Sequence, residues 1–325
     1  MNKKILTSIT VLSLLLLMPV IFTHANPPAF PTENEIIFDA ALSKHGQVLF
    51  VADGTEIKAF SFDDRNLIRE FSNEHTSQIM SLSVSADSTF MASGDRDGKL
   101  VLHCMKSGRS LHTFTVHEGI IMGTDISPDS KFLASASTDN NIVLYDLSKM
   151  EVIEVFRAHT DHVMSVAFSP DGRWLISAGA DGKIAVIDME TKKLHRVLED
   201  LNFFIRDVAF LHHGQSFITV GDDGRYYTWR ITAMGNVQMT RSPRVMRHWI
   251  TSINHSTMDP VFVIANTRGR IIVMAQFSQM ITNIRVPVNT VLLRPREDRK
   301  IEVIATTRGR GIVFIDASDM KIRSY

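Results

Sequence analysis

A repeat of 42 residues predicts that this chain folds as an all-β, seven-bladed propeller with four antiparallel strands in each blade. Three observations support this fold class. An aspartate recurs at this spacing within one turn, a serine or threonine recurs on the strand before it, and each unit breaks into short strand-like runs. The two recurring positions are held by Asp97, Asp139, Asp181 and Asp223, and by Ser93, Ser135, Ser177 and Thr219.

Within one unit the sequence is typical of four β-strands. Residues 164–169 alternate apolar with small or polar side chains, and residues 174–178, 183–187 and 194–198 form three further short runs. A Ser-Pro-Asp-Gly turn at 169–172 separates the first two runs, because proline presets φ and glycine accepts a positive φ. A single sheet of this kind cannot bury both faces, so the units must stack around an axis as propeller blades do.

The repeat defines a single propeller domain at residues 36–325. Four central units repeat clearly, while the first unit and the last two repeat more weakly. Six blades followed by an irregular end is the alternative count. The predicted blades lie approximately at residues 36–74, 75–116, 117–158, 159–200, 201–244, 245–286 and 287–325.

We expect the ring to close through the C-terminus. Residues 321–325 align with the fourth strand of the last unit, so the chain can supply that strand from its own end. The other route, an N-terminal strand from residues 26–34, is disfavoured because Pro27, Pro28 and Pro31 weaken a strand there.

Residues 1–25 have the pattern of a secretory signal peptide. Lys3 and Lys4 precede an apolar run that ends near Phe22, and small residues then predict cleavage after Ala25. Residues 26–35 would form an N-terminal extension. An uncleaved anchor is the alternative, but an apolar run of roughly 18 residues is short for a membrane span. We therefore expect no stable span after cleavage.

The composition limits the classes of function. Hydrophobic residues make up 44% of the chain, as in an ordinary globular domain. The formal net charge is +0, which argues against nucleic acid as a partner. Cys104 is the single cysteine, so an intrachain disulfide is excluded. An exported protein with one thiol is typical of the bacterial periplasm rather than of disulfide-rich secreted domains. The predicted location is the periplasm or the secreted space.

The repeat resembles the WD40 family, whose unit links a His, a Ser or Thr, an Asp and a Trp by hydrogen bonds. Here the pattern is degenerate, because Tyr145, Ile187 and His103 stand at the Trp position and Leu201 replaces the fourth His. The resemblance implies a structural hydrogen-bond network rather than a catalytic site. Its members would be His75, Ser93, Asp97, His117, Ser135, Asp139, Tyr145, His159, Ser177, Asp181, Thr219, Asp223 and Trp229.

No pattern of catalytic residues emerges from the sequence. A phosphate-binding loop, a G-x-S-x-G elbow and an H-E-x-x-H pair are all missing from it. The thirteen histidines are scattered, whereas a metal site needs three or four convergent ligands. We predict that the chain is not an enzyme and has no catalytic residue, metal site or cofactor.

Arginines concentrate in turns of the last three units. In the family that the repeat resembles, these turns and the connections between blades lie on one face of the ring, the top face. Guanidinium groups form paired hydrogen bonds with carboxylate or phosphate, and Arg and Trp are enriched at binding hot spots. The predicted partner-binding residues are Arg241, Arg244, Arg247, Trp249, Arg268, Arg270, Arg308 and Arg310.

The sequence thus favours a protein-interaction scaffold whose protein partner is acidic or bears phosphate. WD40-like rings generally act in this way, which the resemblance extends to this chain. Two alternatives stay open. The arginines can belong to a solvated surface where they pair with local acids, or the chain can be an enzyme or small-ligand sensor with a site in the central channel.

Overall fold

The computed structural model describes residues 36–62, 64–72, 74–211, 214–232, 235–255, 261–275, 278–295, 301–316 and 321–324. The predicted signal peptide, its cleavage site and the extension at 26–35 lie outside the described residues. Within this part of the chain, no helix is long and apolar enough to cross a membrane.

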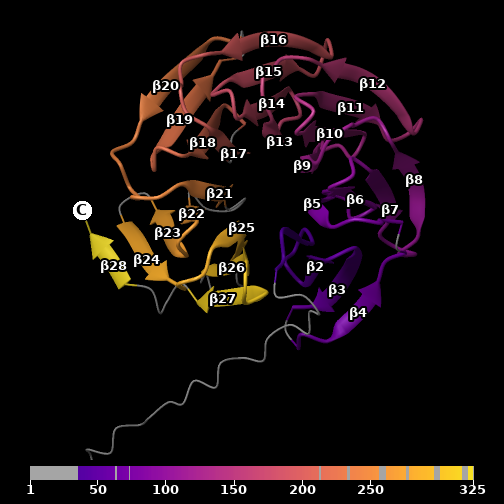
Figure 1. Cartoon of the computed structure of the whole chain (residues 1–325), viewed down its shortest axis with the longest axis horizontal. Helices are drawn as coiled ribbons and strands as arrows, with labels where there is room; N and C mark the ends of the chain where they lie inside the picture. The colour runs from indigo at the N-terminus through magenta and orange to yellow at the C-terminus, as the bar shows by residue number, and fades with distance from the viewer. Residues whose placement is uncertain are drawn as a thin grey trace, which may run out of the picture.

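Antiparallel strands form seven sheets arranged as blades around a central channel (Figure 1). The all-β, seven-bladed fold class is therefore confirmed. In blades 1, 2, 4 and 5 the four strands follow chain order across the sheet, and blade 3 has the same neighbours.

The first three blades are built from these strands. Blade 1 contains β1 (Ala40–Leu42), β2 (Val48–Asp53), β3 (Glu56–Ser61) and β4 (Leu67–Glu70). Blade 2 contains β5 (Ile79–Val84), β6 (Phe90–Asp95), β7 (Leu100–Cys104) and β8 (Ser110–Phe114). Blade 3 contains β9 (Ile121–Ile126), β10 (Phe132–Ser137), β11 (Ile142–Asp146) and β12 (Glu151–Phe156).

The remaining blades follow around the ring. Blade 4 contains β13 (Val163–Phe168), β14 (Trp174–Gly179), β15 (Ile184–Asp188) and β16 (Lys193–Leu198). Blade 5 contains β17 (Ile205–Phe210), β18 (Ser216–Gly221), β19 (Tyr226–Ile231) and β20 (Val237–Arg241). Blade 6 begins with β21 (Ile250–His255), β22 (Phe262–Asn266), β23 (Arg270–Ala275) and β24 (Ser278–Asn283). Blade 7 contains β25 (Val288–Pro295), β26 (Ile301–Thr307) and β27 (Ile312–Asp316).

The last strand does not close its own blade, so this prediction was wrong. β28 (Lys321–Ser324) pairs antiparallel with β24 and becomes a fifth strand of blade 6, with Ile322 opposite Met280 (Figure 1). An outer strand presents a row of unpaired N–H and C=O groups to any segment that reaches it. The 42-residue alignment does not say which edge the chain end will reach.

Seven hydrophobic clusters hold the ring together, one at each contact between neighbouring blades. Between blades 2 and 3, for example, Leu102 and Phe114 pack with Leu133 and Tyr145. The interface that joins the two ends of the ring is of the same kind, because Leu49 and other residues of blade 1 lie in one cluster with residues of blade 7. Among the described residues, apolar burial between blades closes the ring without a shared outer strand, aided by a backbone hydrogen bond from Ile37 N–H to the Thr307 carbonyl.

Polar side chains add a hydrogen bond across each of these contacts near the channel. Aspartate, serine and asparagine side chains reach from one innermost strand to the next, often to a backbone N–H. The seven links are Asp39–Leu82, Ser81–Thr124, Asp125–Phe168, Ser165–Asp207, Asp207–Ile253, Ser252–Val291 and Asn289–Ile37.

Candidate functional site

Blade 3 contains a complete chain of hydrogen bonds among the residues that the repeat singled out. His117 Nδ1 lies 2.8 Å from Asp139 Oδ2 and Nε2 lies 2.7 Å from Ser135 Oγ, which in turn lies 3.1 Å from the Tyr145 hydroxyl. Burial alone would raise the pKa of Asp139, but the bonds from His117 and from backbone N–H groups outweigh it and lower the pKa to about 2. These four side chains therefore serve as hydrogen-bond partners for one another and link neighbouring strands.

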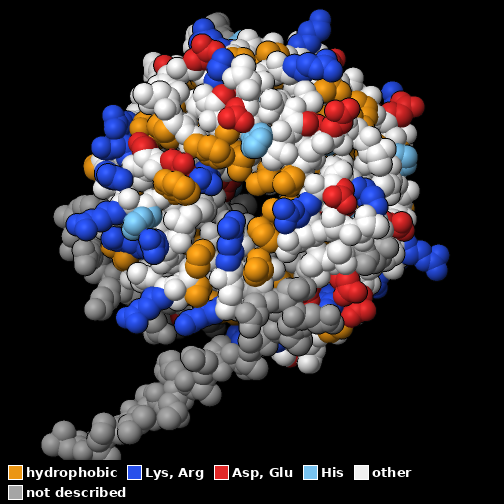
Figure 2. Space-filling view, in the orientation of Figure 1, with side chains coloured by type: hydrophobic (Ala, Val, Ile, Leu, Met, Phe, Trp, Pro, Cys, Tyr) orange, Lys and Arg blue, Asp and Glu red, His pale blue; other side chains and the backbone are white. Residues whose placement is uncertain are grey.

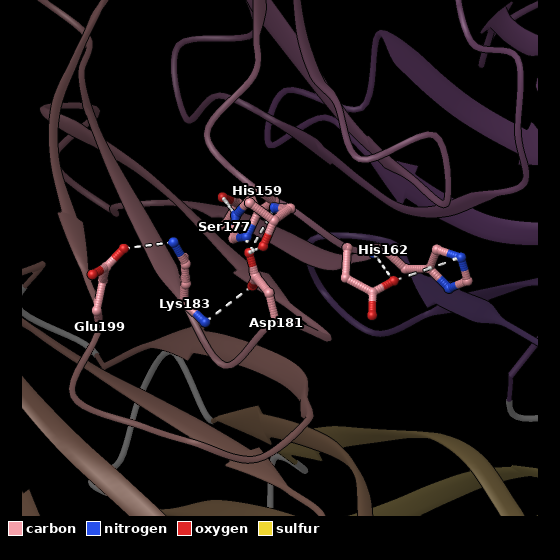
Figure 3. Close-up of polar contacts among 8 residues, drawn as sticks. His159, His162, Ser177, Asp181, Lys183 and Glu199 are labelled. Atoms are coloured by element: carbon pink, nitrogen blue, oxygen red, sulfur yellow. Dashed lines mark hydrogen bonds and ion pairs between the residues drawn. The ribbon is translucent and has the colours of Figure 1, made fainter.

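Blade 4 repeats the arrangement without its last member. His159 Nδ1 lies 3.0 Å from Asp181 Oδ1, and Nε2 lies 2.8 Å from Ser177 Oγ (Figure 3). Ile187 occupies the place of the hydroxyl and is fully buried. Burial lowers the pKa of His159 despite the nearby carboxylate.

In blade 2 the aspartate of the hydrogen-bond network is Asp95. The prediction that Asp97 belongs to this network was therefore wrong. Asp95 Oδ2 lies 2.7 Å from His75 Nδ1, and His75 Nε2 lies 2.6 Å from Ser93 Oγ, which contacts His103 at 2.8 Å. Asp97 is exposed, and its backbone N–H donates to Asp95. A carboxylate two residues earlier reaches the histidine directly. The available signal was an Asp where the neighbouring units have Ser or Gly.

Blade 5 lacks the histidine and uses its aromatic residues instead. Trp229 Nε1 donates to Thr219 Oγ1 at 2.9 Å, and the Tyr227 hydroxyl donates to Asp223 at 2.8 Å. Together the four blades show that the periodic polar residues connect strands within each sheet. Hydrogen bonds of this kind hold the strands of a blade together, so we assign these residues a structural role.

The arginine-rich region forms a pocket on blade 6. The pocket has a volume of about 480 Å³, and three of the predicted arginines line it together with His248, two asparagines and one further arginine. Figure 2 shows basic side chains and a histidine gathered over blade 6 on this face. The lining residues are Arg247, His248, Asn266, Arg268, Arg270, Asn283 and Arg285.

Sequence reasoning missed Arg285. It lies in the connection between β24 and β25, the kind of segment from which Arg247 was chosen. Its φ of +60° is uncommon for a residue other than glycine, and its N–H donates to Asn283 Oδ1 at 2.9 Å. A basic residue in a blade-to-blade connection was the signal that could have found it.

The other predicted residues do not line this pocket. Arg308 and Trp249 line the mouth of the central channel, where Arg206 lies over the Trp249 ring at 4.8 Å. Arg244 donates to backbone carbonyls of its own connection. Arg241 lies over the Tyr227 ring, and Arg310 is exposed on blade 7. Arg308 and Arg310 repeat in blade 7 the positions that Arg268 and Arg270 hold in blade 6, so position within a blade is not enough to place an arginine in this pocket.

The central channel has a volume of about 1080 Å³ and is lined by the innermost strands of all seven blades. Asp39, Asp125 and Asp207 line it, but each accepts hydrogen bonds from its own blade and from the next. Among the described residues no group of three or more His, Cys, Asp or Glu side chains is placed to hold a metal ion. These carboxylates act as links between blades.

Burial raises the pKa of Asp125 to about 7, although backbone N–H groups of Phe168 and Ile126 oppose the shift. In the unfolded chain the Asp125 carboxyl group loses its proton near pH 3.9, the ordinary value for aspartate. The contribution of Asp125 to stability is therefore fully present below about pH 4 and is lost as the pH rises through about 7.

We expect the stability advantage of the wild type over Asp125→Asn to shrink by about 3 kcal/mol between pH 4.5 and about pH 8, because only the wild type titrates at this position. Equilibrium urea unfolding at several pH values measures it. The exposed turn residue Asp129 is the control, since its pKa is lowered and Asp129→Asn should show a constant difference above pH 5. A pH-independent difference for Asp125→Asn would contradict the raised pKa.

Comparison with known proteins identifies the repeat. The family described as WD domain, G-beta repeat matches residues 65–103, 108–146 and 150–188. These three stretches are WD40 repeats. Each begins near the outer strand of one blade and continues through the first three strands of the next.

Solved structures agree with the WD40 fold. The crystal structure of RRP9 WD40 repeats has 14% identity and a TM-score of 0.74, with 91% of this chain and 97% of that chain covered. The Cps50 (Swd1) β-propeller domain of Myceliophteria thermophila has 12% identity and a TM-score of 0.74, with 88% and 96% covered. At such identities the likeness shows the shared fold alone. No curated protein matches the chain. WD40 propellers generally mediate protein–protein interactions and are typically non-catalytic.

Proposed function

We propose that this WD40 propeller is a non-enzymatic scaffold that binds an acidic protein partner through the face that carries the blade 6 pocket. The observation that carries the proposal is the set of four arginines around one pocket, none of which forms an ion pair with a carboxylate of the described chain. By contrast, Arg173, Arg206 and Arg294 each have an acidic partner. Arginines that the fold leaves without acids are suited to acids of another molecule.

The hydrogen-bond partners of the other polar residues support a binding role rather than a catalytic one. The His–Asp pairs of blades 2, 3 and 4 are buried between strands, and the channel carboxylates accept backbone hydrogen bonds. A catalytic acid or base needs access to a substrate proton. The exposed basic pocket has such access, but it offers guanidinium groups suited to binding an anion.

We also propose that the partner is met in the periplasm or the secreted space. The support is the signal-like segment of residues 1–25, with its positive start, apolar run and small residues before Asn26. A mature chain that begins at Asn26 would then carry the whole propeller.

The partner experiment uses the mature chain, Asn26–Tyr325, as bait against an extract of its own cell envelope, in which the native chain should begin at Asn26. We expect a specific partner that Arg247→Glu/Arg268→Glu loses, because reversed charge repels an acidic surface. The matched control is Arg241→Glu/Arg310→Glu, since both arginines are exposed but lie outside the pocket. Affinity-purified proteins are identified by mass spectrometry.

Two results would count against this proposal. A partner that both double variants retain equally would remove the blade 6 pocket from the interface. A partner whose binding does not weaken in high salt would remove its acidic character, because exposed charge pairs are screened within roughly 3 Å at 1 M ionic strength.

A further inference from the structure

The blade 6 pocket is assembled from three separate segments that converge on one turn. Arg268 and Arg270 flank Gly269 in the turn between β22 and β23, while Arg247 and Arg285 come from the connections on either side of the blade. Gly269 has a φ of +77°, and a side chain there would meet the Val286 carbonyl oxygen at 2.5 Å. The close approach of the glycine turn to the β24–β25 connection is what places the arginines together.

The two asparagines of the pocket present donors to it. Asn266 is 1% exposed, and its Oδ1 accepts the backbone N–H groups of Arg268 and Arg270, both at 2.9 Å. Asn283 Oδ1 likewise accepts the N–H of Arg285. Within the described chain neither amide nitrogen has a hydrogen-bond partner. Because each amide oxygen is occupied by backbone, the NH₂ groups are the free halves of these side chains.

One buried donor at the same place lacks a hydrogen-bond partner among the described residues. Arg270 Nε is buried and makes no hydrogen bond among the described residues, while the rest of its side chain lines the pocket. A buried donor without an acceptor is costly, so an acceptor from outside the chain would stabilise it.

The corresponding turn of blade 2 shows what is unusual in blade 6. There Asp95 accepts the N–H groups of Asp97 and Lys99 at 3.0 and 2.9 Å, in the same positions relative to the turn as Asn266 with its two arginines. Asn266 keeps both backbone bonds but brings no negative charge. The guanidinium groups around it are thus not neutralised from within their own turn.

We infer that this pocket binds a phosphomonoester dianion. The inference rests on the proposed function, because it assigns a chemical group to the same face. Guanidinium and amide donors that converge from three segments need an acceptor with several oxygens in different directions. A phosphomonoester offers three terminal oxygens and a charge of about −1.5 to −2 near neutral pH, whereas a carboxylate offers two oxygens and one charge.

The test uses the mature chain and inorganic phosphate in isothermal titration calorimetry. The decisive variant is Asn266→Asp, because an aspartate can accept the same two backbone N–H groups, as Asp95 does, while it replaces the donor by a negative charge. We expect phosphate to bind the wild type and to bind Asn266→Asp at least about tenfold more weakly. Arg310→Gln is the matched control and should change the affinity by less than about twofold, since Arg310 lies outside the pocket.

Further probes identify what carries the phosphate. A phosphoserine tetrapeptide that binds more tightly than glycerol 3-phosphate would support a phosphorylated protein, and the reverse order would support a small soluble phosphomonoester. Unchanged thermal unfolding of Asn266→Asp would show that the variant is folded.

Two results would overturn the inference. One is equal phosphate affinity in the wild type and Asn266→Asp. The other is a dicarboxylate such as succinate that binds as tightly as phosphate. If either occurs while Arg247→Glu/Arg268→Glu still loses the protein partner, the proposed function stands and only the phosphomonoester assignment fails.

Discussion

Replacement of Trp229 with alanine is expected to lower the free energy of unfolding by about 3–5 kcal/mol. Trp229 is 1% exposed and stacks on Phe217 with ring centroids 5.9 Å apart. It lies in the hydrophobic cluster between blades 4 and 5 and donates a hydrogen bond to Thr219. The substitution removes a large apolar surface, leaves a cavity at a blade contact and deprives a buried hydroxyl of its donor.

Equilibrium urea unfolding followed by circular dichroism measures the effect. Trp249→Ala is the control, because the Trp249 side chain is 50% exposed and should change the free energy of unfolding by less than about 1 kcal/mol. Equal losses in the two variants would show that burial between blades 4 and 5 is not what makes Trp229 stabilising.

The second large effect is expected for Asp207→Ala, which should lower the free energy of unfolding by about 2–4 kcal/mol. Asp207 accepts the Ser165 hydroxyl at 2.8 Å, the Val208 N–H at 2.9 Å and the Ile253 N–H at 2.9 Å. It therefore joins blades 4, 5 and 6. Without the carboxylate, two backbone donors and one hydroxyl lose their acceptor beside the channel.

Chemical denaturation also measures this loss, with Asp207→Asn as a graded comparison. Asparagine retains one acceptor oxygen, so we expect roughly half of the loss. Asp200→Ala is the matched control, because Asp200 is exposed on the surface and should be near neutral. If Asp207→Asn lowers the free energy of unfolding as much as Asp207→Ala does, the loss does not depend on the number of acceptor oxygens at this position.

Local periodicity was enough to predict the strands of the central blades. In blade 4 the turn at Ser169–Gly172 and the run from Trp174 lie where the sequence pattern placed them, with φ of +71° at Gly172. Such signals depend on a few adjacent residues, because turn geometry and strand alternation are local properties of the backbone.

The polar network and the arginine pocket were predictable only in part. Asp95 rather than Asp97 meets His75, although both aspartates lie in the same turn. Arg285 joins the pocket while Arg310 does not, although Arg310 repeats the position of Arg270. In each case the outcome depends on which direction a side chain takes from a turn, and a spacing of residues does not contain that direction.

By itself the sequence predicted the all-β class, the count of seven blades and the WD40-like repeat of the central units, because these follow from residue patterns that recur within each unit. Only the tertiary structure decided that β28 joins blade 6, that aspartates link neighbouring blades around the channel, and that four arginines surround Asn266. These features depend on contacts between residues far apart in the chain. Such contacts are set by the packing of whole blades, and the period of the repeat leaves them open.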